Sequence, residues 1–89
     1  MVWKVEISGG AQKALDRLDP AVARRILAFL RERVAGRKNP REVGQALAGS
    51  RFGSLWRYRV GDYRIVANLE DSRLTVLVVR IGHRREVYR

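Results

Sequence analysis

The sequence predicts an α+β domain in which a helical hairpin covers one face of a mostly antiparallel sheet. Apolar residues alternate with charged ones over residues 3–7, recur at helical spacing over 11–34, and alternate again from residue 55 onward. This gives an N-terminal strand, two helices and a three-stranded meander, an order typical of two-layer α+β domains. With 89 residues, the chain is expected to form a single domain spanning residues 1–89.

The first elements are a strand and a helix. Trp3, Val5 and Ile7 alternate with charged residues, which is the pattern of a half-buried strand. Ser8 is a favourable N-cap, because its hydroxyl can accept a hydrogen bond from a free backbone N–H of the first helical turn. The apolar residues within 11–18 then recur at helical spacing and predict the first helix.

The second helix begins at Asp19-Pro20, where Asp19 can cap and proline fits the first helical position. An apolar stripe predicts that it continues to Gly36, a residue that commonly ends helices. Residues 37–54 are rich in glycine and are predicted to form a loop, with Val43 and Leu47 pinning part of it to the core.

The C-terminal part predicts a meander. Gly61-Asp62 separates two apolar runs and indicates a two-residue hairpin. A second turn is expected at 70–73, and the run 74–81 is apolar on both faces, which predicts an interior strand. Gly82 ends that strand, and residues 83–89 are interpreted as a basic tail.

Composition narrows the possible chemistry. The chain has no cysteine and a single histidine, His83, which argues against disulfides and against thiolate or multi-histidine metal sites. The N-terminal residues lack the pattern of a signal peptide, and no apolar run has membrane-spanning length, so we expect a cytoplasmic protein without a membrane partner.

The net charge points to a polyanionic partner. Nineteen Lys and Arg residues against nine Asp and Glu residues give a formal charge of +10. Such a field attracts nucleic acid. Arginines far outnumber lysines, and the planar guanidinium is better suited to phosphate and base recognition than an ammonium.

The predicted hairpin sets two arginines against each other. If Gly61-Asp62 is the loop, Arg59 lies directly opposite Arg64, and Arg57 shares their face. Opposed like charges are unfavourable in a sheet, whereas a bound anion would make the arrangement favourable. The alternative is that these arginines form a solvated hairpin face and pair with Glu70 or Glu42.

Other aromatic and basic residues have plainer interpretations. Trp56, Tyr58, Val60, Tyr63 and Ile65 are expected to point toward the helices, so the first two are interpreted as core residues and not as platforms for stacked bases. The arginines of the second helix are interpreted as a solvated helix face, with contact to RNA or a partner as the alternative; they are Arg24, Arg25, Arg31 and Arg33.

Two segments, residues 56–66 and 79–88, closely resemble the RelE family of toxin–antitoxin ribonucleases, and the predicted order of elements resembles that family over essentially the whole chain. The resemblance implies cleavage of mRNA in the ribosomal A site without a metal cofactor. It also implies inhibition by a RelB-like antitoxin, with operator DNA bound only through the toxin–antitoxin complex.

The resemblance also implies roles for individual residues. Arg64 matches the arginine that stabilises the phosphorane-like transition state, and Arg84 matches the general acid. Tyr88 matches the tyrosine that stacks on a base and orients the 2′-hydroxyl. Arg57 and Arg59 match two positions that are lysines in the best-known member, and here the chain departs from the family pattern.

Because arginine stays protonated in proteins, Arg59 is better interpreted as a phosphate clamp than as a base. Arg57, Arg85 and Arg51 are expected to contact the substrate. His83 is a candidate general base, because histidine titrates near neutral pH. The alternative needs no base, since electrostatic stabilisation and in-line positioning of the 2′-hydroxyl can supply the acceleration.

Two other functions compete with the ribonuclease. A ParE-like gyrase poison shares the fold without the catalytic residues, and a nucleic-acid-binding module would bind without cutting. An inactive member of the family is a third possibility, because the two lysines are absent.

Overall fold

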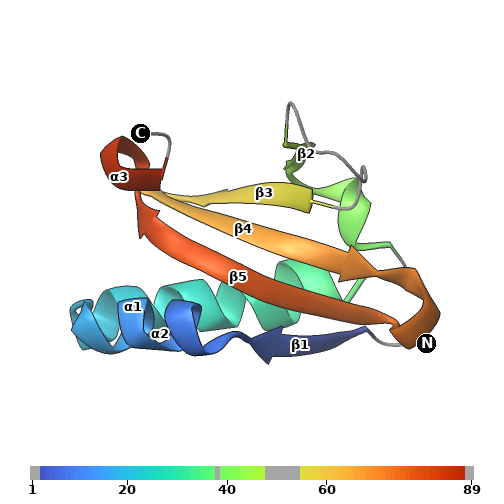
Figure 1. The fold of residues 1–89 in the computed structure, drawn as a ribbon, viewed down its shortest axis with the longest axis horizontal. Helices are drawn as coiled ribbons and strands as arrows, with labels where there is room; N and C mark the ends of the chain where they lie inside the picture. Colours follow the sequence, from blue (N-terminus) through green and yellow to red (C-terminus); the bar gives the residue numbers. More distant parts are fainter. Residues whose placement is uncertain (1–2, 38, 48–54, 88–89) are drawn as a thin grey trace.

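The computed structural model describes residues 3–37, 39–47 and 55–87, apart from the side chains of residues 86 and 87. Figure 1 shows two helices packed against one twisted sheet, which confirms the predicted α+β fold. The elements in chain order are β1 (Lys4–Ile7), α1 (Gly9–Arg17), α2 (Pro20–Phe29), a π-helical turn η1 (Leu30–Ala35), a 3-10 turn η2 (Pro40–Glu42), β2 (Gln45–Ala46), β3 (Leu55–Val60), β4 (Tyr63–Glu70), a 3-10 turn η3 (Asp71–Arg73), β5 (Thr75–His83) and α3 (Arg84–Val87).

The described part of the sheet has five strands in the order β1-β5-β4-β3-β2. The edge strand β1 runs parallel to β5, and the other neighbouring pairs are antiparallel. The sheet is therefore mostly antiparallel, as predicted. It contains one strand more than the sequence pattern indicated, because β2 has only two residues and shows no period.

The helices begin at the predicted caps. The Ser8 hydroxyl accepts a hydrogen bond from the backbone N–H of Ala11 at 3.2 Å, and the Asp19 carboxylate accepts one from Ala21 at 2.9 Å. The second helix runs through α2 and η1 and ends at Gly36, as predicted. No helix in the described ranges is long and apolar enough to cross a membrane.

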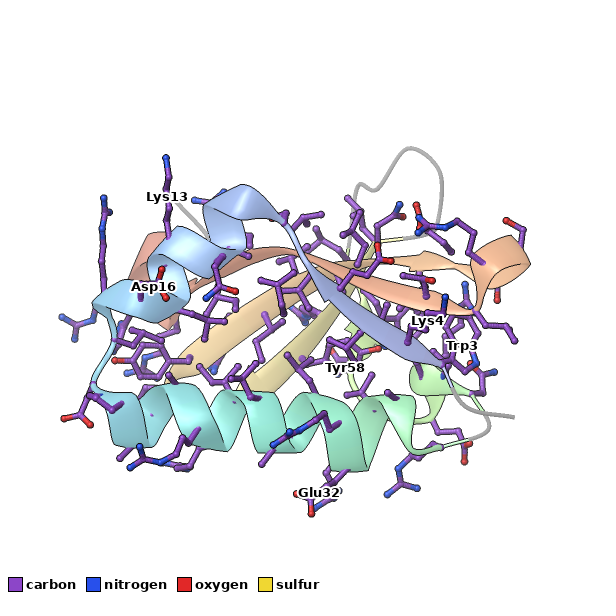
Figure 2. The ribbon with its side chains drawn as sticks, turned by 90° about the horizontal axis from the view of Figure 1, so that it is seen from below. Trp3, Lys4, Lys13, Asp16, Glu32 and Tyr58 are labelled. Atoms are coloured by element: carbon purple, nitrogen blue, oxygen red, sulfur yellow. The ribbon has the colours of Figure 1, made fainter. Side chains whose placement is uncertain are left out.

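The core lies between the sheet and the helix layer. Tyr58 and Ile65 are fully buried and directly paired across β3 and β4, so both point toward the helices. Figure 2 shows Tyr58 between the sheet and the second helix, with Glu32 on the outer side of that helix. The interpretation of Tyr58 as a core residue is confirmed, and half-buried Trp56 packs against the same core.

The segment after the second helix is more regular than the predicted loop. The buried hydroxyl of Tyr58 donates a hydrogen bond to the carbonyl of Pro40 at 2.9 Å. The indole Nε1 of Trp56 donates to the carbonyl of Val43 at 2.7 Å. These side chains of β3 tie residues 40–43 to the sheet edge, and Val43 packs on the core as predicted.

The β3–β4 hairpin has the predicted register. Val60 pairs with Tyr63 and Arg59 pairs with Arg64, so Gly61-Asp62 is the two-residue turn. Gly61 has a φ of +59°, a value that glycine adopts at little cost. The side-chain period of the two strands is therefore fixed as the sequence indicated.

An irregularity in β5 changes which side chains face the helices. Val66 pairs with Arg80 and Ala67 pairs with Val78, which leaves Val79 as an extra residue in β5. This is a β-bulge, and it shifts the alternation of side chains by one position. The Ser8 hydroxyl donates a hydrogen bond to the Val79 carbonyl at 3.4 Å, so the bulge lies where β1 passes into α1.

Candidate nucleic-acid interface

Four arginines gather on the face of the sheet that points away from α1 and α2. Residues paired directly across antiparallel strands point to the same face. Arg59 and Arg64 form one row, and Arg57, Val66 and Arg80 form the next. We call Arg57, Arg59, Arg64 and Arg80 the arginine face.

Arg64 is the most buried charged residue in the described chain, with 7% of its surface exposed. One of its guanidinium nitrogens, Nη1, donates hydrogen bonds to the carbonyls of Gly61 at 3.0 Å and Tyr63 at 3.1 Å. No described carboxylate forms an ion pair with it. A buried cation held by neutral carbonyls keeps its full charge available to an anion, so Arg64 is suited to bind a phosphate.

The neighbours of Arg64 extend the positive surface toward the sheet edge. Arg57 donates a hydrogen bond to the side-chain oxygen of Gln45 in β2 at 2.6 Å. Arg59 is exposed, and together with Arg57 it borders a pocket of about 310 Å³ that Phe29 and Gly44 also line. The arginine face therefore continues into a hollow at the edge of β3.

The acidic residues offered as alternative partners are engaged elsewhere. Glu70 forms an ion pair with Arg73 at 2.5 Å, and Glu42 accepts a hydrogen bond from the backbone N–H of Asn39 as part of a capping box. At the same end of the molecule, Arg41 makes a two-pronged contact with Asp71. The hydrogen bond from Arg41 lowers the pKa of that carboxyl group.

The C-terminal residues expected in the site follow β5 directly. The predicted strand end at Gly82 is wrong, because β5 continues through His83 and is followed by a short helix, α3, which lies across the sheet from α1 and α2 in Figure 1. The backbone N–H of Arg84 donates to the carbonyl of Asp62 at 2.9 Å, which brings the start of α3 to the β3–β4 turn. The side chains of Arg84 and Arg85 are exposed. Tyr88 and Arg51 lie outside the described residues.

His83 is not on the arginine face. It pairs with Tyr63, whose ring packs on the core, and the two rings meet edge to face with centroids 5.8 Å apart. His83 also borders a pocket together with Arg17 and Leu18 of the helix layer. The structure therefore separates this candidate base from Arg64 by the thickness of the sheet, because the bulge at Val79 reverses the alternation of β5.

Comparison with known proteins places these features in a family. The family model described as the ParE toxin of the type II toxin–antitoxin system parDE matches residues 5–88. The chain belongs to the RelE/ParE superfamily. It is a toxin of a type II toxin–antitoxin system.

Individual relatives agree with this assignment. The toxin is 32% identical to Toxin RelG of Mycobacterium tuberculosis over 91 residues, which cover 100% of this chain and 99% of that protein. Its fold is similar to the toxin–antitoxin complex RelBE2 of M. tuberculosis, with a TM-score of 0.81, 23% identity, and coverage of 97% of this chain and 95% of the other. It is also similar to the archaeal RelE–RelB complex of Pyrococcus horikoshii, with a TM-score of 0.71, 27% identity, and coverage of 98% and 100%.

Arg80 is the member of the toxin's arginine face that the sequence pattern missed. It follows an unbroken apolar run, and a regular alternation from Val76 and Val78 would turn it toward the helices. Exposed Val79 marks the bulge, since it is an apolar residue with 37% of its surface in solvent. The signal for this in the sequence is Arg80 itself, the first charged residue after the apolar run. It indicates where the strand stops being buried on both faces.

Proposed function

We propose that this toxin is a ribosome-dependent endonuclease that cuts mRNA in the ribosomal A site. The observation that carries the proposal is the direct opposition of Arg59 and buried Arg64 on neighbouring strands. That arrangement is unfavourable without an anion and favourable with one. The resemblance of residues 56–66 and 79–88 to the RelE family of ribonucleases supports RNA as the anion.

The proposed reaction uses the RNA's own nucleophile. The 2′-hydroxyl attacks the adjacent phosphorus, the bond to the 5′-oxygen breaks, and the products are a 2′,3′-cyclic phosphate and a 5′-hydroxyl end. Negative charge builds up on the phosphoryl oxygens, and preorganised cations stabilise such charge more in the transition state than in the substrate. We assign this role to Arg64, with Arg57 and Arg59 holding the flanking phosphates.

Arg84 and Tyr88 complete the proposed site. By resemblance, Arg84 supplies the proton to the leaving 5′-oxygen, and Tyr88 stacks on a base and orients the 2′-hydroxyl. Arg85 and Arg51 are proposed as further contacts to the RNA. No base is assigned, because His83 lies on the other side of the sheet. In-line positioning and the arginine charges supply the acceleration instead.

The proposed partners follow from the same surface. A RelB-like antitoxin would neutralise the toxin, and an acidic segment of it would cover the arginine face. The likeness to RelB–RelE complexes supports this partner. The toxin would then act on the cytoplasmic ribosome and its mRNA, and contact operator DNA only through the antitoxin complex.

Primer extension on mRNA in a reconstituted translation reaction tests the proposal. The wild type should give codon-phased cuts, and Arg64→Ala and Tyr88→Phe should lose them. Arg24→Ala is the matched control, because Arg24 is an exposed arginine on α2, in the opposite layer. Intact message with the wild type, or equal cutting by wild type and Arg64→Ala, would refute the proposed role.

A gyrase poison is the second candidate, favoured by the match of the ParE family model over residues 5–88. The two functions predict opposite results with the purified toxin. Inhibition of gyrase supercoiling with uncut message in the translation reaction would decide for the gyrase poison. Salt-sensitive RNA binding without cleavage or gyrase inhibition would indicate a binding module or an inactive member.

A further inference from the structure

The single histidine, His83, accepts a backbone hydrogen bond at the start of α3. His83 is the last residue of β5, and its ring is held edge to face against Tyr63 on the helix side of the sheet. Its Nδ1 accepts a hydrogen bond from the backbone N–H of Arg85 at 3.3 Å. The backbone N–H of Arg84 is bound by the Asp62 carbonyl at 2.9 Å.

These two bonds occupy backbone donors at the start of α3. The first N–H groups of any helix have no partner within the helix and need an acceptor from outside it. One acceptor is the β3–β4 turn, which also carries the carbonyl of Gly61 that binds Arg64. The other is the imidazole of His83. The start of α3 is thus tied to the same turn that holds Arg64.

We infer that His83 is a positioning residue that holds the segment of Arg84 and Arg85, at the start of α3, beside the β3–β4 turn through the Nδ1 contact to Arg85. This inference rests on the proposed function for its catalytic consequence, because Arg84 belongs to that segment. It differs from the role of a general base, since His83 would act on the backbone of its own chain and not on the RNA.

The contact depends on the protonation state of the ring. An imidazole nitrogen accepts a hydrogen bond only when it carries no proton, so the ring must be neutral with its proton on Nε2. When the ring becomes an imidazolium, two N–H groups face each other and the contact is lost. The tie therefore requires the neutral ring and is lost when the ring is protonated.

The titratable and charged groups near the ring come from α1, α3, β4 and the β3–β4 turn. Arg17 borders the same pocket from α1, and Arg84 and Arg85 follow in α3. Tyr63 contacts the ring from β4, and Asp62 lies in the turn before it.

Backbone amide exchange measured by NMR tests the tie without reference to RNA. After correction for intrinsic pH dependence, the Arg85 amide of the wild type should exchange roughly 3- to 10-fold faster at pH 5 than at pH 8, since one hydrogen bond is lost. His83→Asn should stay protected at both values, because its amide oxygen can accept in place of Nδ1 and does not titrate. His83→Ala should exchange fast at both.

The Ser8 amide, bound to the Val78 carbonyl at 2.8 Å, is the internal control for global unfolding and should not change. Equal Arg85 exchange in wild type and His83→Ala at both pH values overturns the inference, whatever the RNA result. If the tie holds but no protein cuts message, the proposed function fails and the positioning of the segment stands.

Cleavage rates then separate positioning from base catalysis. His83→Asn should cut message with a kcat close to that of the wild type at pH 8 and should lose the acidic limb of the pH profile. His83→Ala should lower kcat more than it raises KM at every pH. If His83→Asn is as inactive as His83→Ala while its Arg85 amide stays protected, His83 acts on the substrate and the inference is wrong.

Discussion

Arg59 and Arg64 face each other directly across the β3–β4 hairpin, on the side of the sheet that points away from α1 and α2. Arg64 is nearly buried and held by two backbone carbonyls, whereas Arg59 is exposed. The pair has no structural advantage in the free protein, since opposed like charges weaken a sheet. The opposed arginines become favourable when the toxin holds an anion between them. This interpretation has measurable consequences.

Removing one charge of the pair should stabilise the free toxin and weaken its function. We expect Arg59→Gln to raise the free energy of unfolding by roughly 0.2–1 kcal/mol in urea denaturation, because the repulsion across the hairpin is lost. The same variant should bind RNA more weakly. Arg24→Gln on α2 removes an equal charge from the other layer and should leave RNA binding nearly unchanged. A less stable Arg59→Gln protein would contradict the account of the pair.

The rate of message cleavage should fall even when Arg64 is replaced by another positively charged residue. Lysine cannot reproduce the planar guanidinium that contacts the carbonyls of Gly61 and Tyr63 and still offers donors to a phosphate. We expect Arg64→Lys to lower the single-turnover rate of message cleavage by about 10²–10³-fold, the usual effect of losing one preorganised donor. Binding of the toxin to ribosomes, measured by co-sedimentation, should change far less. Full activity of Arg64→Lys would show that charge alone suffices.

The salt dependence of RNA binding should report the number of phosphate contacts. Each lost contact to single-stranded RNA should make the slope of log K against log salt shallower by about 0.7. We therefore expect Arg57→Ala and Arg59→Ala each to reduce the slope by that amount in fluorescence titrations with a short oligonucleotide. Arg33→Ala, an exposed change on η1, should leave it unaltered. Unchanged slopes for both face variants would exclude these arginines as phosphate contacts.

Gly44 should not tolerate a side chain. Its φ is +75°, and a Cβ there would lie 2.3 Å from the Arg57 carbonyl oxygen and 2.8 Å from Cδ1 of Tyr58. We expect Gly44→Ala to destabilise the toxin by at least about 1–3 kcal/mol, the usual cost of such a backbone conformation without glycine. Gly10→Ala is the matched control, because nothing lies within 4 Å of its Cβ position in α1. Equal melting temperatures for the two variants would disprove the close approach.

The contact between Arg41 and Asp71 should contribute a small, pH-dependent stability. The hydrogen bond from Arg41 lowers the pKa of Asp71 in the folded state, so the contribution is present above the unfolded carboxyl pKa, about 3.9, and is lost as the pH falls through the folded value. Because the pair is partly exposed, we expect Asp71→Asn to cost only about 0.2–1 kcal/mol at pH 7. Thermal melts at descending pH should show the difference in stability between wild type and Asp71→Asn shrinking as the pH falls below the unfolded carboxyl pKa. Glu32→Gln, on the outer side of η1, controls for the loss of one negative charge. A stability difference between wild type and Asp71→Asn that stays constant at all pH values would contradict the role given to the Arg41–Asp71 contact.

The sequence by itself determined the two-layer fold and the register of one hairpin. Local signals sufficed there: a serine and an aspartate capped the helices, and Gly61-Asp62 left Val60 only one partner. Once that turn was fixed, the two-residue period of the strands placed Arg57, Arg59 and Arg64 on one face. The opposed arginines could therefore be predicted before any tertiary structure was known.

Only the tertiary structure decided the other half of the site. In β5 the period fails at Val79, where the chain bulges beside the start of α1, and no local signal in an apolar run announces a bulge. The bulge turns Arg80 onto the arginine face and His83 away from it. It thereby added a cation that the pattern had hidden and separated the candidate base from the buried arginine. Side-chain direction after a bulge depends on long-range pairing with β4, which is why the sequence could fix the Arg59–Arg64 pair and not the place of His83.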